Sequence, residues 1–178
     1  MYDEIITFWF EEVEESQYWQ KDEAFDQLIA QRFSAIHQQA SQGELYGWRK
    51  SAEGRLAEII VLDQFSRNIY RDSPQSFSND ALALGLAQEA ISLGLDKELS
   101  AAMRGFLYLP FMHSESAAIH HLAVALYTEL GMKSNLQFEL RHKAIIDRFG
   151  RYPHRNDVLG RASTAEEVAF LQEPGSSF

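Results

Sequence analysis

The chain of 178 residues contains no cysteine, which excludes disulfide scaffolds, thiolate metal sites and cysteine nucleophiles. No stretch approaches the ~20 apolar residues that a membrane-spanning helix needs. The N-terminus, Met-Tyr-Asp-Glu, lacks the basic region of a secretory signal. We therefore expect a cytoplasmic protein that does not insert into a membrane.

Basic residues are also scarce. The chain has 16 Lys and Arg against 26 Asp and Glu, a formal net charge of −10. Such a charge argues against a nucleic-acid-binding protein, because nucleic acids are themselves polyanions. There is no glycine-rich phosphate loop, no His-Glu-x-x-His and no Gly-x-Ser-x-Gly. The absence of these motifs argues against the common classes of nucleotide hydrolase, zinc peptidase and α/β-hydrolase.

The apolar residues, 46% of the chain, are enough for one globular core. We expect a single domain over residues 1–172, followed by a frayed tail over residues 173–178. Apolar positions recur with helical spacing nearly throughout, as in Ile6, Trp9, Phe10 and Val13, and no alternating run predicts a strand. Short connections then predict an all-α fold of about seven to nine helices packed as antiparallel hairpins.

Helix boundaries follow from capping residues and breakers. Asp22 is placed to cap a helix that ends before Gly43, and residues 52–70 predict a strongly apolar helix. Ser114 is a candidate cap for the helix that ends at Gly131. Capping boxes at residues 134–137 and 163–167 predict two further helix starts.

Three polar clusters are candidate functional sites. In the first, helical spacing places Asp63 and Arg67 on the apolar face of the helix over 52–70, with Asn68 and Arg71 widening the polar arc. Asp63 and Arg67 can pair as i, i+4 neighbours. A buried structural ion pair and a ligand site both explain this pattern.

The second cluster is His113 and Glu115. Pro110 is expected to end one helix, and these two residues lie at the expected start of the next. The carboxylate could orient the imidazole as a general base, or the two could form an ordinary hydrogen-bonded cap. A metal site that adds His120 or His121 lacks any known ligand spacing, so we expect no metal and no cofactor. His142 lies on an apolar stripe and is interpreted as a core histidine.

The third cluster, Arg148, Arg151, His154 and Arg155, lies in a segment stiffened by Pro153. Forked guanidinium donors suit phosphates and carboxylates, although arginines in such a loop can also cap helix C-termini.

Asp63-Gln-Phe-Ser-Arg67-Asn68-Ile-Tyr-Arg71, Leu109-Pro-Phe-Met-His113-Ser-Glu115 and Arg148-Phe-Gly-Arg151-Tyr-Pro-His154-Arg155-Asn156 resemble the three signatures of the bacterial domain of unknown function 924 family. The resemblance runs from about residue 5 to residue 171. It departs after Glu115, where this chain has Ser116-Ala-Ala-Ile-His120 in place of the family's acidic residues and glutamine. The resemblance implies a tetratricopeptide-like helical array and no established reaction.

We therefore expect an anionic small molecule, a phosphate or a carboxylate, to bind Arg67, Arg71, Arg104 and the loop over 148–155. Asp63, Asn68, His113 and Glu115 would orient it, provided that these groups converge. One alternative is a scaffold whose concave face binds a peptide. The other is an enzyme in which His113 or His154 is the acid or base. The sequence does not indicate an oligomeric state.

Overall fold

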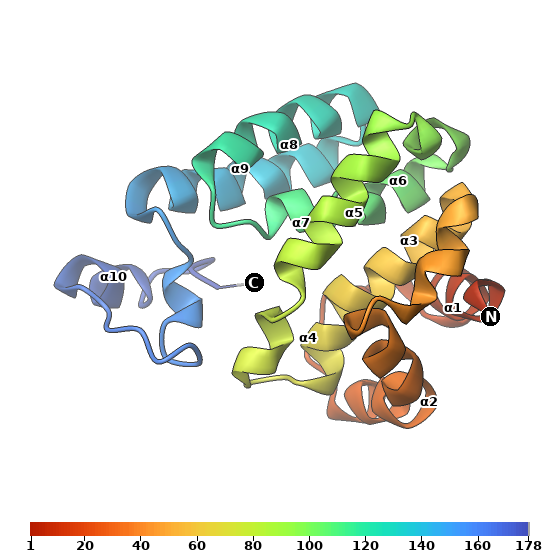
Figure 1. Cartoon of the computed structure of the whole chain (residues 1–178). Helices are drawn as coiled ribbons and strands as arrows, with labels where there is room; N and C mark the ends of the chain where they lie inside the picture. The colour runs from red at the N-terminus through yellow and green to blue at the C-terminus, as the bar shows by residue number, and fades with distance from the viewer. Residues whose placement is uncertain (178) are drawn as a thin grey trace. The chain divides into compact units, whose positions relative to one another are not determined.

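The computed structural model describes residues 1–177, and these residues form helices and turns without any strand (Figure 1). The all-α prediction is confirmed. The α-helices are α1 (Tyr2–Thr7), α2 (Glu23–Ser41), α3 (Ala52–Ile60), α4 (Ser66–Ile69), α5 (Asp80–Ser92), α6 (Ala101–Leu107), α7 (Leu109–Met112), α8 (Ala117–Leu130), α9 (Lys133–Phe149) and α10 (Ala165–Phe170). Two π-helical turns (Phe8–Glu12 and Val61–Phe65) and five 3₁₀ turns (Glu15–Tyr18, Glu44–Lys50, Pro74–Phe77, Leu95–Glu98 and Pro153–Arg155) lie among them.

The chain divides into two compact units. Unit 1 comprises Met1–Arg71 and Gln75–Pro110, and unit 2 comprises Asp72–Pro74 and the chain from Phe111 onward. The prediction of one domain over residues 1–172 stays a prediction. The predicted frayed tail over 173–178 includes Phe178, which lies outside the described residues.

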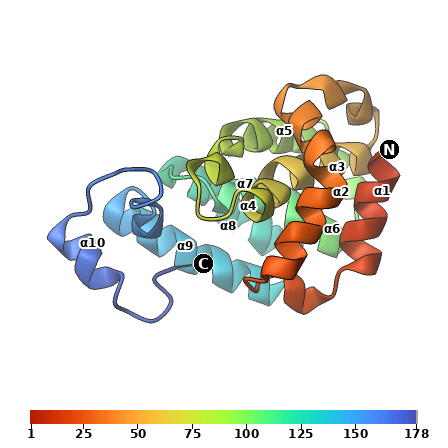
Figure 2. The same cartoon turned by 90° about the horizontal axis from the view of Figure 1, so that it is seen from below.

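A central helix organises unit 1. α3, the π-helical turn Val61–Phe65 and α4 follow one another without a break, as the apolar run over 52–70 predicts. α1, α5 and α6 pack on α3, while α2 packs on α4 and the π-helical turn (Figure 2). The helix is therefore buried from Ala52 to Ser66, apart from the exposed Glu53. Its polar residues must find partners inside the unit, because they have little access to water.

Aromatic rings fill the core beside this helix. The Phe33 ring lies 4.8 Å from the Phe8 ring and 5.0 Å from the Phe65 ring, measured between centroids. The Trp9 ring lies 5.5 Å from that of Phe65. Each such pair contributes about 0.5–1.5 kcal/mol beyond the burial of its area. The helical spacing of these residues thus reflects core packing.

Unit 2 contains the hairpin of α8 and α9, which pack against each other. α8 ends at Gly131, whose φ of 78° is a left-handed conformation that a side chain would disfavour. Beyond α9, Tyr152 and Phe170 pack with Ile145 and Ile146 in a second small core.

Two expected caps are wrong. Ser116, and not Ser114, precedes α8, and its side chain makes no capping bond. α9 begins at Lys133, one residue before Ser134, whose hydroxyl donates to Asn135 Oδ1 and so leaves the expected capping box unformed. The last capping box does form, between Thr164 and Glu167.

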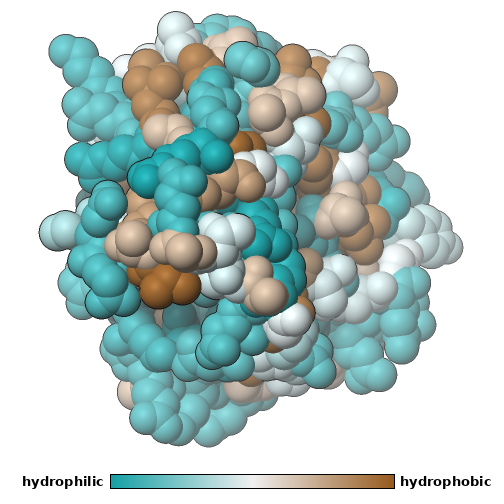
Figure 3. All heavy atoms as spheres, turned by 90° about the vertical axis from the view of Figure 1, so that its left-hand side faces the viewer, coloured by the Kyte–Doolittle hydropathy of each residue, from teal (hydrophilic) through white to brown (hydrophobic). Residues whose placement is uncertain are grey.

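The visible surface is mostly polar. On the face in Figure 3, hydrophilic side chains predominate and apolar ones are scattered among them. None of the helices within residues 1–177 combines the length and apolar character needed to cross a membrane. Short-looped hairpins such as α8–α9 are compatible with a tetratricopeptide-like array, which itself stays a prediction.

Candidate functional site

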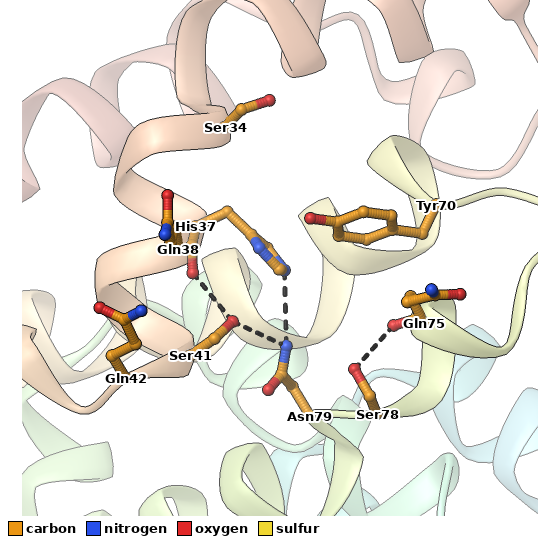
Figure 4. Close-up of a pocket in the computed structure, with 9 residues that line it drawn as sticks. All are labelled: Ser34, His37, Gln38, Ser41, Gln42, Tyr70, Gln75, Ser78 and Asn79. Carbon is orange, nitrogen blue, oxygen red and sulfur yellow. Dashed lines mark hydrogen bonds between the residues drawn. The ribbon is translucent and has the colours of Figure 1, made fainter.

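A polar pocket opens in unit 1. One wall is a face of α2, and the other is formed by Tyr70 and the turn that leads into α5 (Figure 4). The cavity volume is about 420 Å³. Its lining consists of hydroxyl, amide, imidazole and phenol groups: Ser34, His37, Gln38, Ser41, Gln42, Tyr70, Gln75, Ser78 and Asn79.

The α2 wall follows from helical spacing. Ser34, His37 and Ser41 lie three and four residues apart, so they share a face of the helix. Ile29 and Phe33 belong to the buried stripe of α2. His37 lies between this buried stripe and the polar face that lines the pocket. Its side chain is buried although it lines the pocket.

A hydrogen-bond network fixes the floor of the pocket. His37 Nε2 lies 2.7 Å from Ser66 Oγ. Asn79 Nδ2 donates to Ser41 Oγ at 3.0 Å and, more weakly, to Ser66 Oγ at 3.4 Å. Burial lowers the pKa of His37, so its ring is neutral near pH 7. The floor is therefore polar and uncharged.

The predicted residues Asp63 and Arg67 form an ion pair in unit 1, with Arg67 Nη1 3.2 Å from Asp63 Oδ1. Arg67 also donates to both carboxylate oxygens of Asp80, at 2.9 and 3.0 Å. Gln64 Nε2 donates to Asp63 Oδ2 at 2.5 Å. The expected i, i+4 pair is thus confirmed, within a larger network that supplies Arg67 with two carboxylates.

Asn68 and Arg71 meet on one carboxylate, that of Asp26 in α2. Asn68 Nδ2 donates to Asp26 Oδ1 at 2.8 Å, and Arg71 Nη2 donates to the same oxygen at 2.6 Å. Arg71 Nε donates to Asp26 Oδ2. These groups tie the end of α4 to the start of α2.

Arg104 lies apart from those two groups, in α6. Its Nε and Nη2 donate to Tyr108 Oη at 3.2 and 3.0 Å, and that hydroxyl donates to Asp96 Oδ2 at 2.6 Å. Burial, followed by the hydrogen bond to Asp96, raises the pKa of Tyr108 to about 12. Arg104 also lies 3.8 Å from Asp96 Oδ2, so this buried carboxylate has both a tyrosine donor and a nearby guanidinium.

In unit 2, Glu115 binds a guanidinium and a backbone amide. Arg161 donates to both of its oxygens, at 2.6 and 2.9 Å, and the N–H of Tyr152 donates at 2.8 Å. Burial alone would raise the pKa of Glu115, but these donors hold it below its ordinary value. Glu115 is therefore an ionised anchor for the segment that contains Tyr152.

The other predicted residues of unit 2 include Arg155, His154, His113 and Arg148. Arg155 is buried with its guanidinium 4.5 Å from the centre of the Tyr152 ring, and the His154 ring is 5.5 Å from that ring. His113 follows α7 and is half-buried. Arg148 Nε donates to Glu166 at 2.9 Å.

Arg151 contacts Glu167 through two nitrogens, at 2.7 and 2.8 Å. This bidentate hydrogen bond, followed by the Thr164 N–H, lowers the pKa of Glu167 to about 2. Most of the predicted arginines thus belong to local ion pairs within one unit. Their role as one ligand site stays a prediction.

No group of three or more histidine, aspartate or glutamate side chains suited to a metal ion occurs in the described part of the chain. The pocket residues Ser34, His37, Ser41 and Asn79 are not among the candidates that the sequence singled out. The one sequence signal that could have indicated the pocket was the helical spacing of Ser34, His37 and Ser41 on α2.

The fold and the pocket define an all-α protein with a small polar cavity in one unit. The sequence matches the family described as "Bacterial protein of unknown function (DUF924)" over residues 5–175. The chain therefore belongs to this family, as the three motifs indicated. It is also similar to the solved structure of a protein of unknown function from Agrobacterium tumefaciens, with 39% identity, a TM-score of 0.91 and 96% of each chain covered. Comparison with curated proteins gives no match.

Proposed function

We propose that the protein binds a small, polar, uncharged molecule in the pocket of unit 1. The observation that carries this proposal is a cavity of about 420 Å³ whose lining side chains include no carboxylate, ammonium or guanidinium group. That volume lies within the range of about 300–1,000 Å³ typical of small-molecule sites. Amides and hydroxyls recognise uncharged polar groups by hydrogen bonds.

The ion pairs favour an uncharged ligand over an anion. Arg67, Arg71 and Arg151 each donate at least two hydrogen bonds to a carboxylate. An anion that bound these groups would have to compete with a carboxylate already in place, which costs the existing charge-assisted hydrogen bonds. The anionic-ligand hypothesis therefore has less support than the polar pocket, and the peptide scaffold and the His113 or His154 acid–base enzyme stay predictions.

A thermal-shift screen with a matched pair of variants tests the proposal. Gln38 lines the pocket, whereas its neighbour Gln39 is also exposed on α2 but does not line the pocket. Gln38→Phe should fill the cavity, and Gln39→Phe should not. Uncharged polar metabolites are screened beside phosphates and carboxylates.

At ~100-fold excess over Kd, a ligand adds about 2.7 kcal/mol to the free energy of unfolding. We expect an uncharged compound to stabilise the wild type and the Gln39→Phe variant but not the Gln38→Phe variant. Stabilisation only by anions, lost in Arg67→Lys or Arg151→Lys, would refute the proposal and support the anionic ligand instead.

A further inference from the structure

The serine hydroxyls of the pocket all have their protons engaged. Ser34, Ser41 and Ser78 each line the cavity, and each hydroxyl donates its single proton to a backbone carbonyl. The acceptors are Ala30 O at 2.5 Å, His37 O at 2.9 Å and Gln75 O at 2.9 Å, respectively. Because the proton is committed to the backbone, the hydroxyl offers only its lone pairs to a ligand.

The same reasoning fixes the tautomer of His37. Ser66 Oγ lies 2.6 Å from the carbonyl of Leu62, which can only accept, so the Ser66 proton points to that carbonyl. The His37 Nε2 atom, 2.7 Å from Ser66 Oγ, must therefore be the donor of the second bond. In a neutral ring the proton on Nε2 leaves Nδ1 as an acceptor.

Asn79 completes the pattern. Its Nδ2 faces Ser41 Oγ and Ser66 Oγ, two oxygens whose own protons are committed to carbonyls. Both of them can accept, which assigns the nitrogen of the amide to this side and leaves Oδ1 as an acceptor (Figure 4). The 3.5 Å contact between Asn79 Nδ2 and His37 Nε2 joins two donors and is not a hydrogen bond.

We infer that the ligand enters this pocket as a hydrogen-bond donor and that it is a polyol or sugar, whose hydroxyl protons meet the lone pairs of Ser34, Ser41 and Ser78. This inference rests on the proposed function and specifies the class of ligand. The wall offers no carboxylate to an ammonium ion. Uncharged hydroxyl groups are therefore the donors that suit it best.

The tautomer is testable without a ligand. In ¹⁵N-labelled protein near neutral pH, the ring of His37, identified by its disappearance in His37→Gln, should show a protonated Nε2 and an unprotonated Nδ1. A proton on Nδ1 would reverse the donor direction through Ser66 and overturn the inference, whatever the pocket binds.

Binding is tested with pairs of probes that differ only in donors. myo-Inositol, glucose and glycerol are titrated beside their fully O-methylated ethers, which keep the oxygen acceptors and lose every O–H. We expect the hydroxylated probes to shift the amide resonances of α2 around Ser41, and the ethers to bind about tenfold more weakly or not at all. Ser92→Ala removes a comparable serine-to-carbonyl bond outside the pocket and should leave binding unchanged.

His37→Gln places an amide where Nε2 bonds Ser66 but lacks an acceptor at the Nδ1 position, so it should weaken polyol binding about tenfold with little loss of thermal stability. Equal or tighter binding of the ethers would leave the proposed function intact and overturn the donor inference. Binding of no uncharged probe at all would overturn both.

Discussion

The His120 ring and the Glu139 carboxyl group are joined by a hydrogen bond in the interior of unit 2. His120 Nδ1 lies 2.7 Å from Glu139 Oε1, and both side chains are fully buried. His120 Nε2 is 2.9 Å from the carbonyl oxygen of Ser114, so Nε2 must carry a proton and donate it. A second proton lies between Nδ1 and Oε1. The pair is neutral if this proton is on Glu139, and it is an ion pair if the proton is on His120. Burial raises the pKa of Glu139, although His120 opposes this rise, which favours the neutral acid.

This buried hydrogen bond predicts different effects of two substitutions at Glu139. Glu139→Gln keeps a donor toward His120 Nδ1 and should lower the free energy of unfolding by about 1 kcal/mol. Glu139→Ala leaves the buried imidazole without this partner and should cost about 3 kcal/mol or more. Urea denaturation measures both. Equal losses would show that the donor retained by Gln does not stabilise the buried imidazole.

A second prediction concerns acid stability and His142. Burial lowers the pKa of His142 to about 3, while the hydrogen bond from Nδ1 to the carbonyl of Phe138, at 2.8 Å, works in the opposite direction. Between pH 3 and pH 6.5 the unfolded chain therefore binds a proton that the folded chain does not. The free energy of unfolding should fall as pH falls through this window, by at most about 1.4 kcal/mol per pH unit from this residue.

The variant His142→Asn isolates that contribution. Its amide can still donate to Phe138 O, but it does not titrate. Denaturation at several pH values should give a shallower slope for the variant than for the wild type below pH 6.5. Parallel curves would mean that His142 takes up its proton over the same pH range in the folded and the unfolded protein.

Local sequence signals predicted the helical fold and some helix starts, but they did not predict the pocket. Asp22 caps α2 as expected, with its carboxylate accepting from the Ala24 N–H, because a cap depends only on the next few residues. The pocket needs Ser41 of α2 to face Asn79, 38 residues away in the chain. Serine, glutamine and asparagine are also common on exposed surfaces, so their spacing did not reveal a cavity.

The charged motifs show the same limit. The Asp63–Arg67 pair was predictable because both residues lie on one helix. The role of Asp26 was not, since this carboxylate is 45 residues from Arg71 in the chain. Residue spacing predicts neighbours on one helix, whereas partners distant in the chain depend on how the helices pack.

A third prediction compares a partly buried ion pair with an exposed one. Arg67 and Asp80 meet through two hydrogen bonds, with side chains 20% and 19% exposed. Arg148 and Glu166 meet with side chains 44% and 64% exposed. Double-mutant cycles to alanine should give a coupling of about 1–3 kcal/mol for the first pair and below about 0.5 kcal/mol for the second. Similar coupling free energies in the two cycles would contradict the expectation that burial strengthens an ion pair.

The last prediction concerns the hydroxyl of Tyr152, which joins segments of unit 2 that are distant in sequence. Tyr152 Oη donates to the carbonyl of Met112 at 2.5 Å, and His120 Nε2 lies 3.2 Å from the same oxygen. Tyr152→Phe keeps the ring but removes the donor from a buried carbonyl, so the free energy of unfolding should fall by about 1–3 kcal/mol. Tyr46→Phe, at a side chain that is 72% exposed, is the matched control and should change stability by less than about 0.5 kcal/mol.

Amide hydrogen exchange separates the loss of this bond from general destabilisation. The Tyr152 N–H donates to Glu115, so its protection reports whether the segment still holds its place when the hydroxyl is absent. In Tyr152→Phe we expect the amides of Tyr152 and Arg155 to exchange faster than the global change in stability requires. Exchange that accelerates equally in α9 would instead mean that the hydroxyl contributes only to the stability of unit 2 as a whole, because a local anchor affects its own segment first.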